Sequence, residues 1–427
     1  MNEYLINGGL PLNGTIKTSG NKNAALPCIA AALLTDKEVI LRNIPDIEDV
    51  QVMLEIYAAL GGEVTCLKPN VYKLKLKNIN TSAIPAEKAK KIRASILFAG
   101  PLLARLGKVI LHPPGGDVIG RRRLDTHFMA LGELGAKFKT GERFIFTAKS
   151  LQGADIFLDE ASVTGTENAV MAAVFASGKT TISNAASEPH VQDLCRMLSL
   201  MGAKIEGIGS NILKITGVKK LNGCDFTIGP DFMEVGSFIG LAAVTRGDLC
   251  IEGARIQDMR AAKIAFGKLG ISWAHEGNII HIPKKQKMKV NCDFGGMVPK
   301  IDDAPWPGFP PDLTSIITVV ATQVKGTVLI HEKMFESRMF FVDKLIGMGA
   351  QIVLCDPHRA VVSGPSRLSG SDLISPDVRA GMAMLIAAMC AEGKSVIRNI
   401  YQIERGYENL AGRLSTLGAD IIRTSES

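Results

Sequence analysis

The sequence predicts an α/β (α+β) protein of two similar domains, because one helix-and-strand unit occurs six times along its 427 residues. A phrase of Leu or Met, Gly and a small or apolar residue ends six amphipathic segments. Its glycines are 67 to 79 residues apart, at Gly61, Gly135, Gly202, Gly270, Gly349 and Gly418. A turn followed by a β-rich segment precedes each phrase, at 36–41, 107–111, 178–182, 247–251, 326–330 and 393–397.

The elements within a unit follow from its local pattern. An apolar helical segment comes first, such as 23–34, and the β-rich segment follows it. A second helix is expected next, because 50–60 has apolar residues at helical spacing on one face. Gly61 can adopt the left-handed conformation that ends this helix, and a further β-rich segment comes after it. Each unit is therefore expected to run helix, strand, loop, helix and strand, often with one more strand.

The domain organisation follows from the size of the unit. A single unit would not easily bury its own helices and strands, so we group three units into each of two domains. We place one domain at 22–229 and build the other from 1–21 together with 230–427. The cleft between two such domains is the expected place for a ligand.

The composition excludes several classes of protein. The net charge is only +7 and aromatic residues make up 5%, so we expect no nucleic-acid partner. The longest nearly apolar runs are too short to span a bilayer, and the first residues lack the pattern of a secretory signal. Eight scattered cysteines without a CxxC pair favour free thiols in a reducing cytoplasm. Motifs of nicotinamide dehydrogenases, P-loop ATPases, serine hydrolases and metal sites are missing.

The segment SGNKNAALP (19–27) is a candidate anion site. Lys22 and Asn23 stand where a glycine turn leads into a helix. Backbone N–H groups at a helix N-terminus attract anions, and a lysine there adds a cation, so phosphate is the natural ligand. The alternative is a solvated lysine in a turn.

The segment PPGGDVIGRRRLDTH (113–127) has the most unusual composition. Its glycines would allow it to move as a lid over a site. Arg121, Arg122 and Arg123 could bind carboxylate or phosphate through paired hydrogen bonds. Asp117 lies among the glycines. The alternatives are a solvated run of charges or an unspecific basic patch.

Three further charged residues lie beside turns or apolar helices. Asp312 follows a proline-rich loop just before an apolar helix, where capping of that helix is the commoner role. Arg405 lies in a glycine turn, and Arg379 lies beside an apolar helix with no other charge. Both arginines need partners, and internal ion pairs are the alternative to a binding role.

These segments together resemble the UDP-N-acetylglucosamine 1-carboxyvinyltransferase family of enolpyruvyl transferases. The resemblance runs from residue 1 to about 422 and rests on the six-fold unit and on SGNKNAALP, PGGDVIGRRRLD, SVTGT, GPDFMEVGSF, FPPDL, MFESR and IYQIERGYE. It implies two domains, each of three βαβαββ repeats in an inside-out α/β barrel. It also implies transfer of enolpyruvyl from phosphoenolpyruvate to the 3′-hydroxyl of UDP-N-acetylglucosamine, with release of phosphate, in the first committed step of peptidoglycan synthesis. No metal or organic cofactor is implied.

The resemblance also assigns roles to individual residues. Asp312 would lie near the 3′-hydroxyl, and the phosphoenolpyruvate site would contain Lys22, Asn23, Arg122, Arg379 and Arg405. Asn23 would also touch the reacting sugar, and Arg93 would lie close to the diphosphate. The uridine part would be held by Arg122, Arg123, Leu124, Asp125, Ser162, Val163 and Thr164, with a backbone contact from Met334.

Two residues depart from the family pattern. Most members have a cysteine where this chain has Asp117, and that cysteine is both the general acid and the thiol that fosfomycin alkylates. Some members carry aspartate there and are active. We therefore expect Asp117 to be the general acid and the enzyme to resist fosfomycin. Glu160 stands where the family often has a basic residue, so nucleotide affinity or acceptor choice could differ.

Two alternatives remain at this point. The sister enzyme that adds enolpyruvate to shikimate 3-phosphate shares the repeats, but 19–27 lacks its serine-rich turn. A non-catalytic paralogue that binds a UDP-sugar would explain Asp117 and Glu160, but it would not need Lys22, Arg122, Asp312 and Arg405 together. Turnover distinguishes the three functions.

Overall fold

The computed structural model describes residues 2–116 and 123–425. The chain forms two compact units, and it passes from one to the other after Ser19 and again after Gly229. We call the unit between Gly20 and Gly229 the central-segment unit, and the unit built from both ends of the chain the terminal-segment unit. Among the described residues, no helix is long and apolar enough to cross a membrane.

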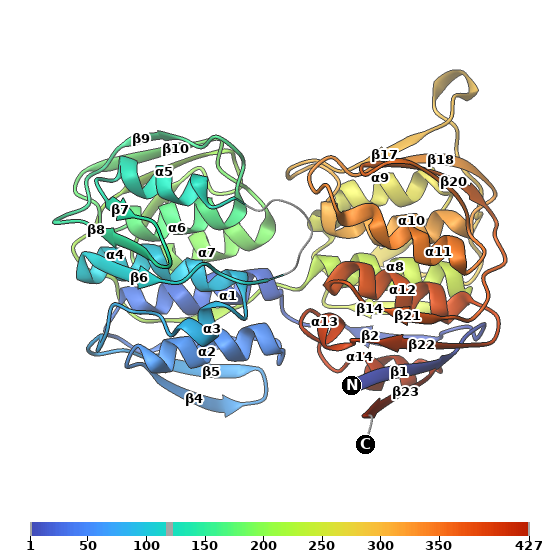
Figure 1. Ribbon diagram of the computed structural model, residues 1–427, viewed down its shortest axis with the longest axis horizontal. Helices are drawn as coiled ribbons and strands as arrows, with labels where there is room; N and C mark the ends of the chain where they lie inside the picture. Colours follow the sequence, from blue (N-terminus) through green and yellow to red (C-terminus); the bar gives the residue numbers. More distant parts are fainter. Residues whose placement is uncertain (1, 117–122, 426–427) are drawn as a thin grey trace. The chain divides into compact units, whose positions relative to one another are not determined.

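The central-segment unit contains three sheets (Figure 1). Their strands, in order across each sheet, are β13 (Cys224–Thr227), β3 (Val39–Arg42), β5 (Val71–Lys75) and β4 (Glu63–Lys68); β6 (Lys108–Leu111), β8 (Phe144–Thr147) and β7 (Lys137–Lys139); and β9 (Asp155–Phe157), β10 (Lys179–Ser183), β12 (Ile212–Thr216) and β11 (Lys204–Glu206). The helices are α1 (Lys22–Ala31), η1 (Ala32–Leu34), α2 (Glu48–Ala59), α3 (Ala86–Ala89), η2 (Arg93–Phe98), α4 (Ala99–Leu106), α5 (Asp125–Glu133), α6 (Val163–Ala173) and α7 (Pro189–Leu200).

The terminal-segment unit also contains three sheets. Their strands are β21 (Asp372–Ile374), β22 (Lys394–Arg398), β1 (Asn2–Asn7) and β23 (Asp420–Ser425); β2 (Gly14–Lys17), β14 (Leu249–Glu252), β16 (Ile279–Ile282) and β15 (Ala274–Glu276); and β17 (Lys300–Asp302), β18 (Gly326–His331), β20 (Arg359–Gly364) and β19 (Gln351–Asp356). The principal helices are α8 (Phe232–Thr245), α9 (Arg260–Lys268), η5 (Pro311–Leu313), α10 (Thr314–Thr322), η6 (Arg338–Phe341), α11 (Val342–Gly347), α12 (Val378–Cys390), α13 (Tyr401–Glu404) and α14 (Leu410–Ser415).

The predicted six-fold repeat is confirmed by the pairing of the strands. In one repeat, β9 and β10 are parallel with Ile156 opposite Ile182, and α6 connects them. Helix α7 then leads to β11 and β12, which are antiparallel to each other, and β12 is antiparallel to β10. The order is therefore βαβαββ. In the three-stranded sheet, a parallel bridge from Ala83 to Ile110 stands where the other sheets have their first strand.

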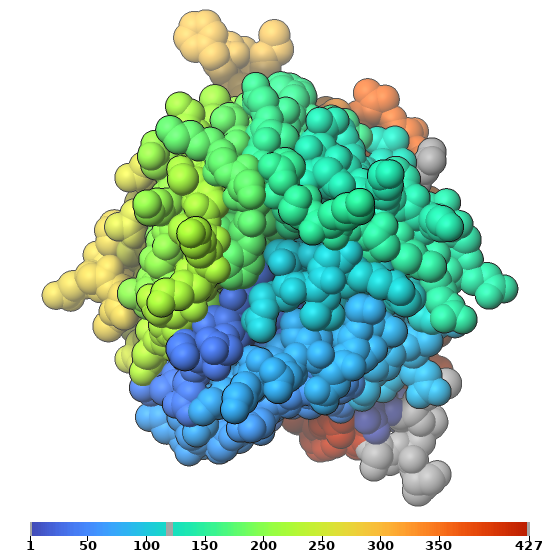
Figure 2. Space-filling view, turned by 90° about the vertical axis from the view of Figure 1, so that its left-hand side faces the viewer, coloured from blue at the N-terminus to red at the C-terminus, as the bar shows by residue number. Residues whose placement is uncertain are grey.

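Three of these repeats are completed by strands from distant parts of the sequence. Strand β13, from the end of the central segment, pairs in parallel with β3 near its start. Figure 2 shows the corresponding yellow-green and blue segments side by side on the surface of this unit. In the terminal-segment unit, β2 pairs in parallel with β14, and β1 lies between β22 and β23.

In both units the most buried helices, such as α6, α8 and α12, are inside and the sheets are outside (Figure 1). Every residue of α8 and α10 is buried, and so is every residue of α12 except Cys390. Strands such as β10 alternate between buried and less buried residues, because only one face packs on the helices. The predicted inside-out arrangement is thus confirmed. The described strands form six separate sheets, three in each unit.

Candidate active site

Lys22 lies at the first position of α1, as its sequence context predicted. The Asn21 side chain caps the helix and accepts a hydrogen bond from the Ala24 amide at 3.2 Å. The Lys22 ammonium lies 2.6 Å from the carboxylate of Asp49, in the first turn of α2, and both side chains are largely buried. The lysine is therefore not a solvated turn residue. Asn23 follows it in the same helical turn.

Arg93 and Arg123 meet in the central-segment unit. The Arg93 guanidinium donates to the backbone oxygen of Arg123 at 2.9 Å. Arg123 in turn lies 3.4 Å from Asp159 and 3.8 Å from Asp125, which begins α5. Two predicted nucleotide-side arginines thus share one region, where acidic neighbours hold the Arg123 side chain.

Ser162, Val163 and Thr164 form the start of α6. The Ser162 hydroxyl caps this helix by accepting from the Gly165 amide at 3.3 Å. The Thr164 hydroxyl lies 3.0 Å from Nε2 of buried His127, on α5. This bond ties the 162–164 segment to the helix that follows Arg123 and Leu124.

The tautomer of His127 follows from its neighbours. The Asn168 amide oxygen accepts from the Gly100 amide, so its nitrogen donates to the Ile96 carbonyl and to His127 Nδ1. Nδ1 is therefore an acceptor, and Nε2 carries the proton that it donates to Thr164. Burial and, to a smaller extent, the charge of Arg93 together lower the pKa of His127 to about 3, so the ring is neutral at physiological pH.

We expect a His127→Gln variant to reduce the acid sensitivity of folding. The unfolded chain takes up a proton near pH 6.5, whereas the folded chain does so only near pH 3. Wild-type stability should therefore fall as the pH drops through this interval, and the variant should lose less. Thermal unfolding at pH 7 and pH 5 measures the difference, with the exposed His275→Gln as a matched control. Equal slopes for wild type and His127→Gln would contradict the assignment.

Glu160 lies beside the same helix starts. Its carboxylate accepts from the Thr126 hydroxyl at 3.4 Å, and its backbone oxygen accepts from the Ser162 amide at 2.7 Å. Thr126 also donates to Asp159 at 2.8 Å. The acid that departs from the family pattern is therefore in the predicted uridine region.

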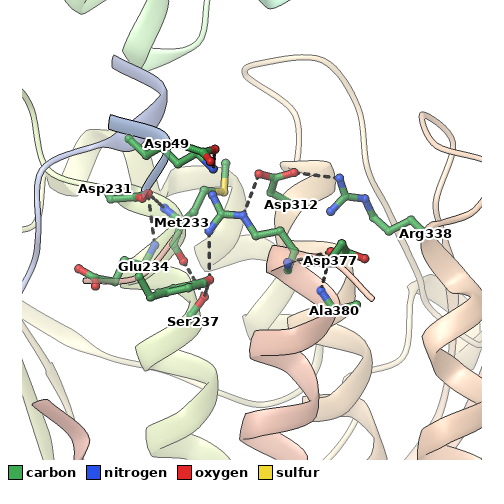
Figure 3. Close-up of polar contacts among 12 residues, drawn as sticks. Asp49, Asp231, Met233, Glu234, Ser237, Asp312, Arg338, Asp377 and Ala380 are labelled. Carbon is green, nitrogen blue, oxygen red and sulfur yellow. Dashed lines mark hydrogen bonds and ion pairs between the residues drawn. The ribbon is translucent and has the colours of Figure 1, made fainter. Parts of the chain in front are cut away.

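Asp312 is held by two buried arginines in the terminal-segment unit (Figure 3). Arg338 Nη2 lies 3.0 Å from Oδ1 of Asp312, and Arg379 Nε lies 3.0 Å from Oδ2. Only 3% of Arg338 and 6% of Arg379 is exposed. The N-cap residues of η5 and α10 are Pro310 and Leu313, and Asp312 lies within η5.

Further polar contacts fix Arg379. Its Nη1 donates to the Tyr407 hydroxyl at 3.1 Å, and that hydroxyl lies 2.9 Å from the hydroxyl of Ser237. Asp377 caps α12 by accepting from the Arg379 and Ala380 amides. Burial raises the pKa of Asp231 to about 6, against the charge of Arg379, which lowers it.

Two further predicted residues of the terminal-segment unit, Arg405 and Met334, have polar contacts of their own. Arg405 is 5% exposed and donates to the Gln402 side chain at 2.9 Å. The Met334 amide donates to Glu332 at 3.3 Å, while its side chain is 38% exposed. Asp117 and Arg122 lie outside the described residues. Within the described ranges, no group of three His, Cys, Asp or Glu side chains could hold a metal ion.

Several site residues were not predicted. Arg338 belongs to MFESR, which supported only the resemblance, and Tyr407 lies two residues after Arg405. Asp49 directly precedes the predicted helix at 50–60, and His127 ends the segment 113–127, but neither gave a signal of its own. In each case the role depends on a partner distant in sequence, so spacing along the chain could not reveal it.

Comparisons with known proteins agree on one group. The family model described as EPSP synthase (3-phosphoshikimate 1-carboxyvinyltransferase) matches residues 6–414. Proteins named UDP-N-acetylglucosamine 1-carboxyvinyltransferase from Treponema denticola and Treponema pallidum are 70% and 63% identical to the chain, each over 421 residues and 99% of both chains.

Solved structures agree on the fold. The enolpyruvyl transferase NikO from Streptomyces tendae superposes with a TM-score of 0.89 at 23% identity, over 100% of this chain and 99% of its own. An EPSP synthase from Acinetobacter baumannii superposes with a TM-score of 0.77 at 16% identity, over the full length of both chains.

Proposed function

Because the chain belongs to the EPSP synthase family and, within it, to the UDP-N-acetylglucosamine 1-carboxyvinyltransferases, we propose that it transfers enolpyruvyl from phosphoenolpyruvate to the 3′-hydroxyl of UDP-N-acetylglucosamine. The observation that carries this proposal is the 70% identity over 99% of both chains to a protein of that name. The reaction would open peptidoglycan synthesis in the cytoplasm.

Asp312 is the proposed base. The reaction needs a group that accepts the proton of the 3′-hydroxyl while its oxygen attacks C2 of phosphoenolpyruvate. A carboxylate offers about four lone-pair sites. The bonds from Arg338 and Arg379 each use one site, on different oxygens of the carboxylate. The two bonds also fix the carboxylate in one orientation, which favours transfer in one direction.

Cations are proposed to bind phosphoenolpyruvate, which carries a phosphate and a carboxylate. The candidate cations from the family pattern are Lys22, Arg122, Arg379 and Arg405, and the neutral amide of Asn23 is a further polar candidate. Lys22 lies at a helix start, where anions are favoured. Arg379 and Arg405 are almost fully buried, and a cation removed from water binds an anion more strongly than a solvated one does.

Asp117 is the proposed general acid. It would give its proton to C3 as the bond between the sugar oxygen and C2 forms. Loss of a proton from C3 and departure of phosphate then restore the double bond in the product. An aspartic acid can serve if its surroundings raise its pKa, as burial does for other carboxyls. It has no thiolate, so the enzyme should resist fosfomycin.

The nucleotide is proposed to bind the central-segment unit. Arg93 would lie near the diphosphate, and the uridine part would contact Arg123, Leu124, Asp125, Ser162, Val163 and Thr164. Two features support a formed site, namely the Arg93–Arg123 bond and the Thr164–His127 bond. Glu160 in this region would weaken diphosphate binding if its charge faced the ligand.

The direct test is phosphate release from phosphoenolpyruvate with two acceptors. We expect release that depends on UDP-N-acetylglucosamine and none with shikimate 3-phosphate. Mass spectrometry should find an enolpyruvyl ether of the UDP-sugar. Release only with shikimate 3-phosphate would favour the reaction in the family model's description. Binding of the UDP-sugar without release would favour a non-catalytic protein.

A further inference from the structure

A second carboxyl pair lies beside the Arg338–Asp312 ion pair. Asp303 directly follows β17, and Glu332 directly follows β18. These strands are parallel and in register, with Asp302 opposite His331, so the two acids leave the same edge of the sheet side by side. Both residues are 0% exposed.

Arg338 connects this pair to Asp312. Its Nη2 makes the 3.0 Å bond to Asp312, whereas its Nε lies 3.8 Å from Glu332, beyond hydrogen-bonding distance. Neither Nε nor Nη1 has a hydrogen-bond partner among the described residues, and the same holds for Glu332 Oε2 and Asp303 Oδ2. The guanidinium is thus bonded to one carboxylate while a second lies nearby.

The protonation state of Glu332 accounts for this asymmetry. Burial raises the pKa of Glu332 to about 9, Arg338 opposes the rise, and the neighbouring Asp303 charge adds to it. The other groups that face it are the Thr314 hydroxyl and His358, whose Nδ1 lies 2.8 Å from the Glu332 backbone oxygen. A neutral Glu332 can donate its proton to Asp303, whose Oδ1 accepts from the Lys333 amide.

We propose that Glu332 is a positioning residue for the transfer reaction, because its neutral carboxyl, beside Asp303, leaves the charge of Arg338 to orient Asp312. The inference rests on the proposed role of Asp312 as the base. When Glu332 loses its proton, two buried carboxylates compete for one guanidinium. Arg338 then moves toward Glu332, and Asp312 loses its bond to Arg338.

The pH dependence of turnover tests this role. In the wild type, kcat should decline as the pH rises through about 9, where Glu332 ionises. Glu332→Gln keeps a neutral donor of the same size, so its kcat at pH 7 should stay within about threefold of the wild type, and the decline attributable to residue 332 should disappear. Glu332→Leu removes the donor and should lower kcat by about 10- to 100-fold, with less effect on KM.

Two controls separate this inference from other causes. Glu167→Gln neutralises another fully buried carboxyl, on α6, and should leave the alkaline decline in place. Melting temperature gives a readout without turnover. A carboxyl whose pKa is raised on folding lowers stability as the pH rises from about 4.5 to about 9, so Glu332→Gln should flatten that slope.

Three outcomes would overturn the proposal. They are an unchanged alkaline decline in Glu332→Gln, a loss of more than about 100-fold at pH 7 in that variant while it remains folded, and an unchanged stability slope. A wild-type protein that transfers no enolpyruvyl group would instead contradict the proposed function. The stability slope would then still decide whether Glu332 holds a proton.

Discussion

Replacing Asp117 by cysteine is expected to make the enzyme sensitive to fosfomycin while keeping it active. The reagent is an epoxide, and a thiolate opens it to form a stable thioether, whereas the wild-type carboxyl lacks that thiol. Stoichiometric fosfomycin should therefore inactivate Asp117→Cys and leave the wild type unaffected. Mass spectrometry should find one adduct, on the introduced cysteine. The exposed native thiols of Cys66, Cys292 and Cys355 serve as internal controls for unspecific alkylation.

The companion variant Asp117→Asn tests the acid itself. An amide cannot give a proton to C3, so kcat should fall by about 10²- to 10⁴-fold, the range that a general acid contributes. The KM for the UDP-sugar should change little, because Asp117 is not proposed to bind it. Undiminished turnover in Asp117→Asn would remove the acid role. Inactivation of the wild type by stoichiometric fosfomycin, with an adduct in 113–121, would remove the predicted resistance.

The fold was predictable because local sequence patterns indicate its repeat. Each unit ends a helix with glycine, and Gly61, Gly135 and Gly202 all have the positive φ that this position needs. The sequence did not indicate which distant strand completes each sheet. Strands β2 and β13 are short segments with no pattern that names their partners, and each pairs with a strand more than 180 residues away. Pairing of this kind depends on packing of the whole unit.

The sequence motifs predicted individual residues of the candidate site but not the contacts between them. The resemblance identified Asp312 and Arg379 separately, but their 3.0 Å bond joins residues 67 positions apart. Arg338, the second partner of Asp312, came from a third segment. Asp312 alone suggested a helix cap, because an aspartate before an apolar helix most often has that role. In the structure, Asp312 is bonded to two buried guanidinium groups, and their burial arises only from the tertiary structure.

Replacing Arg379 by methionine is expected to have the largest effect on stability. Arg379 is buried and bonds both Asp312 and Tyr407, and its guanidinium also lies over the Tyr407 ring at 5.4 Å. Methionine fills similar space but leaves these partners without their cation. Breaking a buried pair from one side typically costs about 3–5 kcal/mol, so we expect a loss of this size in the free energy of unfolding. Denaturant unfolding measures this free energy. The control is Arg367→Met, at an arginine whose side chain is 80% exposed, and it should leave the midpoint of unfolding unchanged.

The loss should also depend on pH, which separates electrostatics from packing. The charge of Arg379 lowers the pKa of Asp231, which burial raises to about 6. Without that charge the pKa of Asp231 should rise further, so the folded state would hold a proton that the unfolded chain releases near pH 3.8. Stability then falls as the pH rises above that value, and Arg379→Met should lose more stability at pH 8 than at pH 5.

Arg379→Lys keeps a charge but cannot bond Asp312 and Tyr407 in the same geometry. It should therefore recover part of the stability and little of the turnover. Equal losses in Arg379→Met at both pH values would show that the residue acts through packing, and full turnover in Arg379→Lys would show that the position of Asp312 does not depend on this bond.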